Sequence, residues 1–132
     1  MNEITVGFEG QKRDLNDLLF DLFEAGLLRE GLEKQTPGDA TIVLRPMELR
    51  KTAFAHVVME IGLIVGKDVA LPLFVAWLYD KWKKNGEKRI TVIINAHYYE
   101  FNSGPLTKAL EEAIRSEDSG TATKQRGDSA DS

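Results

Sequence analysis

The residue types most often used in catalysis are few in this chain and poorly grouped for it. His56 and His97 are far apart in the sequence, and neither has a carboxylate at a metal-binding spacing such as H-E-x-x-H. The glycine loop at residues 7–10 lacks both nucleotide-binding spacings, and Glu9 within it would repel a phosphate. The chain has no cysteine, which excludes a thiolate nucleophile, a thiolate metal site and a disulfide. We therefore expect no enzyme activity, no catalytic or metal-binding residue and no cofactor.

Acidic residues recur at helical spacing near the start of the chain. They are Asp14, Asp17, Asp21 and Glu24. The first three share one side of a helix, where a cation could bind. No second segment supplies the matching Glu-x-x-His ligands of a helical metal site, so a solvated acidic face is the favoured interpretation.

A cluster of basic residues is the most distinctive feature of the expected surface. It comprises Lys81, Lys83, Lys84, Lys88 and Arg89, with Trp82 among them. Such a cluster can contact an acidic protein or a phosphate backbone. Lysines at a helix C-terminus also stabilise its negative end, so the cluster needs no function to explain it. This structural interpretation is favoured over the functional one.

Three aromatic residues, Tyr98, Tyr99 and Phe101, follow the basic cluster. In a strand, Tyr99 and Phe101 share one face and Tyr98 points to the other, so at least one tyrosine lies outside the main core. An outward tyrosine is a good interface anchor. The residues predicted to bind a partner are Lys81, Trp82, Lys84, Lys88, Arg89, Tyr98 and Tyr99.

Composition favours a single ordinary domain with a protein partner. The chain has 132 residues, 42% of them hydrophobic, and a net charge of -4. This charge gives no overall positive field, so nucleic acid is the less favoured partner, although the basic cluster from Lys81 to Arg89 leaves it open. A homo-oligomer is also left open.

The sequence favours a cytoplasmic protein that does not enter a membrane. The first ten residues alternate between polar and apolar types and do not resemble a signal peptide. The longest uninterrupted apolar run, from Val69 to Leu78, has about 10 residues, whereas a spanning helix needs about 20. A buried helix is therefore expected there.

Apolar periodicity predicts the element order β-α-β-α-α-β-β-α. The predicted strands are residues 3–8, 40–44, 88–95 and 98–102, and the predicted helices begin at Asp14, Glu48, Asp68 and Ser103. The second helix is expected to continue to Val65, and residues 33–39 are expected to form a loop. The first two strands should be parallel, joined by a right-handed crossover, while the last two form an antiparallel hairpin.

These elements predict an α+β domain with a mixed four-stranded sheet and helices mainly on one face. The globular domain is expected to cover residues 1–116. Residues 117–132 contain no large apolar side chain to offset the entropy of ordering, so they are predicted to form a disordered tail.

The order of elements resembles the effector-associated constant component domains of bacterial conflict (defence) systems. The residues that carry the resemblance are Phe74-Val75-Ala76-Trp77-Leu78-Tyr79-Asp80-Lys81-Trp82, the strand Arg89-Ile90-Thr91-Val92-Ile93-Ile94 and the terminal helix. The resemblance covers residues 3–116 through short hydrophobic motifs. The chain departs from the family in the polar region 49–56 and lacks the usual Gly-Pro-rich middle. The resemblance implies a non-enzymatic adaptor that links variable effectors to sensors.

The sequence therefore favours a non-catalytic protein-interaction module, either an adaptor or an inhibitor in a defence or counter-defence system. One alternative is a nucleic-acid-binding protein that uses the basic cluster. Another is a small enzyme or ligand-binding domain that uses polar groups such as His97, Glu100 and Asn102.

Overall fold

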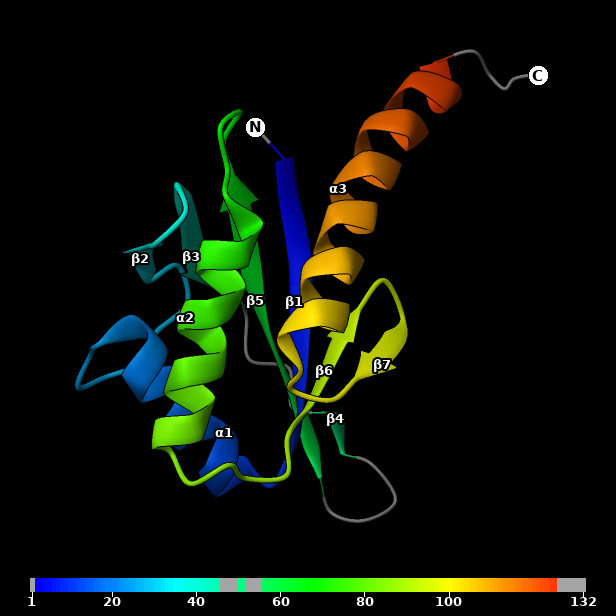
Figure 1. The fold of residues 1–132 in the computed structure, drawn as a ribbon. Helices are drawn as coiled ribbons and strands as arrows, with labels where there is room; N and C mark the ends of the chain where they lie inside the picture. Colours follow the sequence, from blue (N-terminus) through cyan, green and yellow to red (C-terminus); the bar gives the residue numbers. More distant parts are fainter. Residues whose placement is uncertain (1, 46–49, 52–55, 126–132) are drawn as a thin grey trace.

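A computed structural model of the chain describes residues 2–45, 50–51 and 56–125. Within these ranges, one sheet of seven strands is combined with three helices (Figure 1). The elements are β1 (Asn2–Gly10), α1 (Lys12–Phe23), β2 (Glu33–Thr36), β3 (Ala40–Leu44), β4 (Arg50–Lys51), β5 (Val57–Val65), α2 (Leu71–Lys84), β6 (Thr91–Ile94), β7 (His97–Tyr99) and α3 (Ser103–Gln125). The predicted α+β class is confirmed.

The sheet has the strand order β2-β3-β5-β1-β6-β7, and β4 pairs separately with β5. Every pairing is antiparallel. The prediction of a mixed four-stranded sheet is therefore wrong. The predicted first two strands, β1 and β3, flank β5 on opposite sides, so no parallel crossover joins them.

The largest error in the prediction concerns the helix expected over residues 48–65. Its second half is β5, which is the central strand between β1 and β3. The segment is buried along nearly its whole length, so its apolar residues show no alternation that would distinguish a strand from a buried helix. Its β-branched residues Val57, Val58, Ile61, Ile64 and Val65 favour the strand. Residues 48–49 and 52–55 lie outside the described residues.

The region 33–39, predicted as a loop, contains the short strand β2 paired with β3. The turn chemistry was correctly located, because residues 37–39 join the two strands and Gly38 has a φ of 87°. The amide of Ala70 donates a 2.8 Å hydrogen bond to the Gly38 carbonyl. A Cβ at Gly38 would lie 2.4 Å from the Ala70 oxygen, so this contact between the turn and the start of α2 requires glycine.

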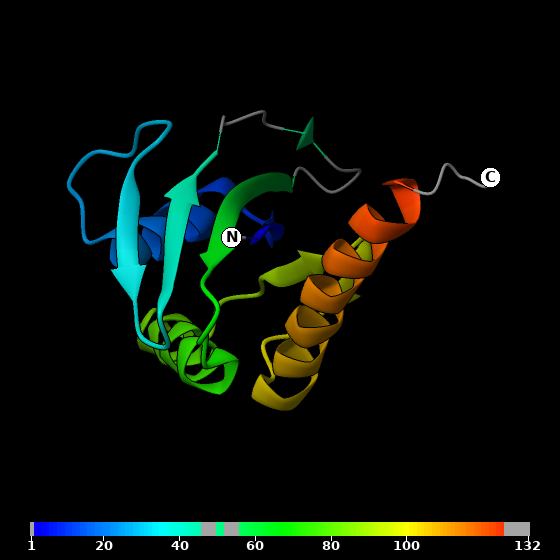
Figure 2. The same cartoon turned by 90° about the horizontal axis from the view of Figure 1, so that it is seen from above.

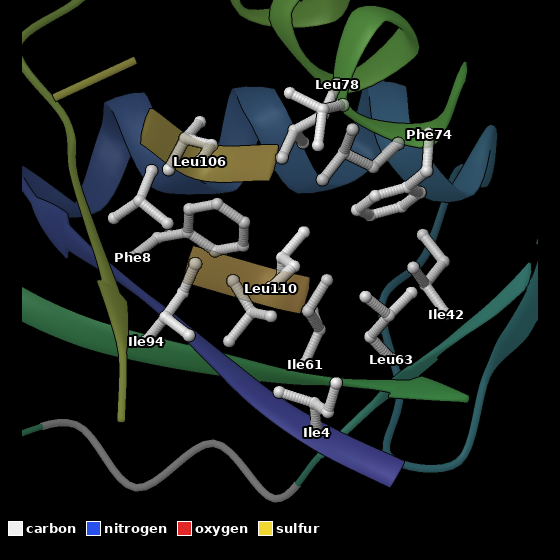
Figure 3. Packing of buried hydrophobic residues seen from close by; sticks show 14 of the residues in the cluster. Ile4, Phe8, Ile42, Ile61, Leu63, Phe74, Leu78, Ile94, Leu106 and Leu110 are labelled. Atoms are coloured by element: carbon white, nitrogen blue, oxygen red, sulfur yellow. The ribbon is translucent and has the colours of Figure 1, made fainter. Parts of the chain in front are cut away.

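The core lies between the sheet and the three helices, and Figure 2 shows α2 and α3 along one side of the curved sheet. Alternate residues of β1 and β5 enter the core together with the apolar stripe of α1, as the helical spacing of that stripe predicts. Figure 3 shows the packing of Ile4, Phe8, Ile42, Ile61, Leu63, Phe74, Leu78, Ile94, Leu106 and Leu110. All of these residues belong to one buried cluster.

The ends of α1 and α2 agree only in part with the prediction. The helices were predicted to begin at Asp14 and Asp68, whereas α1 begins at Lys12 after the N-cap Gln11 and α2 begins at Leu71 after the N-cap Ala70. Asp14 lies in the first turn of α1, where it still faces the positive helix end. The C-terminus of α2 is as predicted, with lysines in the last turn and Asn85 as the C-cap.

The β6–β7 hairpin is also confirmed, although β7 covers His97–Tyr99 and not residues 98–102. Asn95 and Ala96 form its turn, with φ angles of 56° and 65°. Positive φ at both central positions is typical of the tight two-residue turn that matches strand twist.

The backbone of α3 continues as a helix to Gln125, past residue 117 where the disordered tail was expected to begin. Ala113 and Ile114 of this helix contact the core, and Figure 1 shows its final turns projecting beyond the sheet. Residues 126–132 of the predicted tail lie outside the described residues. No helix in the described ranges has both the length and the apolar character needed to cross a membrane.

Candidate functional site

The sheet face opposite the helices carries the most distinctive combination of exposed groups. Strand alternation places one set of residues on this face, which we call the open face. Its members are Glu3, Thr5, Gly7 and Glu9 of β1, Val58, Glu60, Gly62 and Ile64 of β5, Thr91 and Ile93 of β6, and Tyr98 of β7. Their neighbours along each strand fill the core. On the open face itself, Gly7, Val58 and Gly62 are buried, while Glu3, Thr5 and Tyr98 are exposed and the other members are half-buried.

An apolar strip runs across the centre of the open face. It consists of Val58, Gly7, Ile93 and Tyr98. A Cβ at Gly7 would lie 3.3 Å from Cβ of Ile93 and 3.7 Å from Cγ1 of Val58, so these two side chains pack closely over the glycine. Tyr98 pairs with Ile93 across the hairpin and is 65% exposed. The strip therefore ends in a large and accessible aromatic ring.

A groove of about 500 Å³ adjoins the strip where β1 ends and β6 begins. It is lined by Glu9, His56, Trp82, Glu87, Lys88, Arg89, Ile90, Thr91, Glu100 and Phe101. We call it the Trp82 groove. Two of the predicted cations, Lys88 and Arg89, thus face three glutamates, and the local charge is mixed.

Trp82 itself supports the wall of this groove. Its ring stacks on Phe101 with a centroid distance of 4.8 Å, and Phe101 stacks in turn on Phe8 at 6.3 Å. The indole N–H of Trp82 donates a 2.7 Å hydrogen bond to the carbonyl of Lys88. Trp82 therefore fixes the loop that carries Lys88 and Arg89, and only part of its surface faces solvent.

The other predicted cations are not gathered with Lys88. Lys84 lies 3.2 Å from Asp80, one turn earlier on α2. Lys81 lies 3.8 Å from Glu24 of α1 and 6.0 Å from the ring of Trp77. The predicted basic cluster is therefore divided between two places, and each part has acidic neighbours.

Glu24 joins α1 to both α2 and β2. The Nζ of Lys34 donates a 2.9 Å hydrogen bond to its carboxylate. This hydrogen bond and the charge of Lys34 lower the pKa of Glu24, with a smaller contribution from Lys81. Asp21 accepts a 2.6 Å hydrogen bond from the amide group of Asn85. Two of the four acids expected to form a solvated face thus connect neighbouring elements.

The tyrosines lie as the sequence predicts. Tyr98 points outward, while Tyr99 is half-buried against the core and Phe101 is buried. Of the two histidines, His56 lines the Trp82 groove and His97 is exposed at the start of β7. No three His, Cys, Asp or Glu residues in the described part of the chain are close enough to hold a metal ion.

Sequence reasoning missed the contribution of β1 and β5 to this surface. The signal for β1 was present, because Glu3, Thr5 and Glu9 alternate with core residues. The signal for Val58 and Glu60 was hidden by the helical interpretation of their segment. Comparison of the chain with protein-family models, with curated proteins and with solved structures found no match.

Proposed function

We propose that this chain is a non-catalytic protein-interaction module that binds a partner protein through the open face. The observation that carries the proposal is the exposed ring of Tyr98 beside the half-buried Ile93, at the end of the apolar strip and next to polar and charged side chains. The sequence resemblance implies an adaptor in a bacterial conflict system, and an inhibitor in a defence or counter-defence system is the other form of this proposal.

The open face has the arrangement found in protein interfaces, with an apolar centre inside a polar rim. Glu9, Thr91 and Arg89 lie at the rim on the side of the Trp82 groove. Tyr98 supplies a ring that a partner can cover completely, and tyrosine is enriched among residues that dominate binding energy.

Charge supports a protein partner over nucleic acid. Phosphate binding requires a continuous positive surface, whereas Lys81 and Lys84 have acidic partners and Arg89 shares its groove with three glutamates. A protein surface of mixed charge complements such a pattern better than a polyphosphate does.

Partner capture from the source cells tests the proposal. The baits are the wild-type chain, Tyr98→Ser and Leu27→Ser. Leu27 is a matched control because it is also a large, exposed hydrophobic residue, at 75% exposure, but lies outside the open face. We expect one protein to be retained by wild type and Leu27→Ser, with at least about 30-fold weaker binding to Tyr98→Ser, as for a hot-spot residue. Equal binding by all three baits would contradict the proposal.

The Trp82 groove supports a second candidate function, the binding of a small polar ligand. Its volume of about 500 Å³ lies within the usual range of ligand sites, and it combines aromatic rings with His56, Arg89 and several glutamates. A thermal-shift screen of polar metabolites tests this function. A ligand that binds here should raise the melting temperature of wild type but not of Arg89→Ala.

A further inference from the structure

The edge of β1 continues past the end of its neighbour β6. β1 pairs with β5 over all nine residues, from Asn2 to Gly10. It pairs with β6 only from Val6 to Glu9, because β6 turns back at Asn95 and Ala96. Figure 1 shows β1 extending beyond the β6–β7 hairpin, with no strand on that side. One edge of residues 2–5 therefore has no strand partner within the described part of the chain.

The hydrogen-bonding phase of the sheet shows which backbone groups face this exposed edge. The two-residue turn makes Ile94 and His97 a hydrogen-bonded pair, so Ile93 directs its N–H and C=O toward β1 and Gly7. Alternation along β1 then directs the N–H and C=O groups of Glu3 and Thr5 the same way. The hydrogen bond from the Arg45 amide to the Glu60 carbonyl, on the far side of β5, confirms this phase independently.

A hollow of about 430 Å³ lies along the exposed edge. Its lining is Glu3, Ile4, Thr5, Gly7, Glu60, Ile93, Asn95, Ala96 and Ala113. Ala113 comes from α3, and its small side chain leaves room beside the strand. Within the described residues, no hydrogen bond engages the outward N–H and C=O groups of Glu3 and Thr5. Both residues are exposed.

We propose that this hollow, named here the β1 slot, binds an extended segment of a partner protein, which adds to the sheet as an antiparallel strand in line with β6. The two N–H donors and two C=O acceptors of Glu3 and Thr5 lie in strand geometry, so they are complementary to another extended backbone. At about 3.3 Å per residue, the exposed edge accommodates roughly four residues. Because the slot involves the backbone of β1 and needs neither Tyr98 nor Arg89, the proposal goes beyond the open-face interaction.

The lining also defines the side chains that the segment should carry. The residue opposite Ile4 points to the core side, next to Ala113, where a small apolar side chain fits. The residue opposite Glu3 lies on the open face. Glu3 and Glu60 line that side of the slot, and the Glu3 carboxylate is already paired with Arg45, so a polar residue is favoured there. The segment should therefore alternate between small apolar and polar residues.

Selection from a phage library of random linear octapeptides provides the probe. Selected peptides are synthesised, and their affinities are measured for wild type, Thr5→Pro and Thr5→Ala. Proline removes the N–H that faces the slot without removing a bond to β5, while alanine removes only the side chain. We expect a class of alternating peptides that binds Thr5→Pro at least about tenfold more weakly and Thr5→Ala within about twofold of wild type.

Two further measurements keep the test independent of how well Thr5→Pro folds. N-methylation of each peptide amide in turn should weaken binding at every second position, because only alternate amides face β1. In wild type, the Thr5 amide should exchange rapidly when free and slowly when the peptide is bound. The Val6 amide, which faces β5, should be protected in both states.

Several results would overturn the β1 slot proposal. One is that no selected peptide binds Thr5→Pro more weakly than Thr5→Ala. Another is that N-methylation does not weaken binding at every second position of the peptide. Protection of the Thr5 amide in the free monomer would mean that the chain covers its own edge. Its protection only in a dimer would identify a second copy as the occupant. None of these results would affect the open-face proposal, which is tested at Tyr98.

Discussion

Glu3 of β1 and Arg45, the residue that follows β3, form an ion pair across the intervening strand β5. The Nε of Arg45 donates a 2.7 Å hydrogen bond to the Glu3 carboxylate, and its Nη2 donates a second to the same oxygen. The pair passes over Gly62, where a Cβ would lie 2.3 Å from the Glu3 carboxylate and 2.9 Å from Val43. Because Gly62 has no side chain, there is room over β5 for an ion pair between the segments on its two sides.

We expect Gly62→Ala to lower the free energy of unfolding by about 1–3 kcal/mol, because the new methyl group must displace both the carboxylate and Val43. Gly26→Ala is the matched control, since nothing lies within 4 Å of the Cβ it would add. Urea denaturation of the two variants and wild type measures the difference. A Gly62→Ala variant as stable as wild type would show that Glu3 does not occupy this position in solution.

Stability should depend on pH through the pair of Glu24 and Lys34. The folded-state pKa of Glu24 lies below its ordinary value of 4.5, mainly because of the hydrogen bond from Lys34. The pair therefore stabilises the fold above the unfolded pKa, and this contribution is lost as the pH falls through the folded value. In Lys34→Met the pKa of Glu24 should move up toward its ordinary value, as followed by NMR titration of the side-chain carboxyl carbon. In Lys67→Gln, which replaces an exposed lysine elsewhere, the Glu24 titration should be unchanged.

The apolar face of α2 allows a comparison between two adjacent residues. Phe74 is 1% exposed and Leu73 is 58% exposed. Phe74→Ala should lower the free energy of unfolding by about 3–5 kcal/mol, because it leaves a cavity beside Trp77. Leu73→Ala should change it by at most about 0.5 kcal/mol. Chemical denaturation measures both values. Similar losses for the two variants would contradict the assignment of Phe74, and not Leu73, to the buried face of α2.

Local patterns in the sequence were sufficient to predict elements with one solvent-exposed and one buried face. The stripe of α1, the C-terminus of α2 and the alternation of β1 each report burial on one side only. They failed for β5, whose central position buries both faces and removes the periodic signal. Sheet order could not be derived either, because β1 and β3 become neighbours of β5 through tertiary pairing.

The candidate site was predictable to a similar extent. Hairpin alternation correctly placed Tyr98 and Tyr99 on opposite faces with at least one outside the core, and the structure shows that the outward residue is Tyr98. The division of the basic cluster was not predictable, because Lys81 turns toward α1 while Lys88 lies beyond the end of α2. The part played by Trp82 depended on its stacking on Phe101, which is distant in sequence.

Two substitutions separate the stacking of Trp82 from its hydrogen bond. Trp82→Ala removes the stack on Phe101 and should destabilise the fold by about 2–4 kcal/mol, somewhat less than a fully buried tryptophan. Trp82→Phe keeps a ring but loses the bond to the Lys88 carbonyl, which should cost about 0.5–1.5 kcal/mol. Thermal denaturation measures both. Trp77→Phe is the control, since no hydrogen bond of its indole is found in the described residues. Equal losses in Trp82→Phe and Trp82→Ala would mean that the stack contributes nothing.

The positions of Lys84 and Lys88 predict different effects of charge reversal on partner association. Lys88 lines the Trp82 groove beside the open face, whereas Lys84 is paired with Asp80 on the exposed side of α2. Charges at the rim of an interface mainly set the association rate, and their influence falls with distance and salt. For the partner captured with wild type, Lys88→Glu should therefore reduce the association rate several-fold in low salt. The dissociation rate and the melting temperature should stay almost unchanged.

Lys84→Glu is the matched control for Lys88→Glu, because it makes the same change in net charge at a nearby residue, the last of α2. It should alter the association rate by less than about twofold in stopped-flow or surface-binding measurements. An equal slowing by both variants would indicate that only overall charge matters and that the groove does not adjoin the bound partner. A loss of affinity of several orders of magnitude between about 50 and 200 mM salt would instead indicate phosphate contacts and favour nucleic acid. A protein partner predicts a shallow salt dependence, with the difference between Lys88→Glu and wild type disappearing as the salt concentration rises.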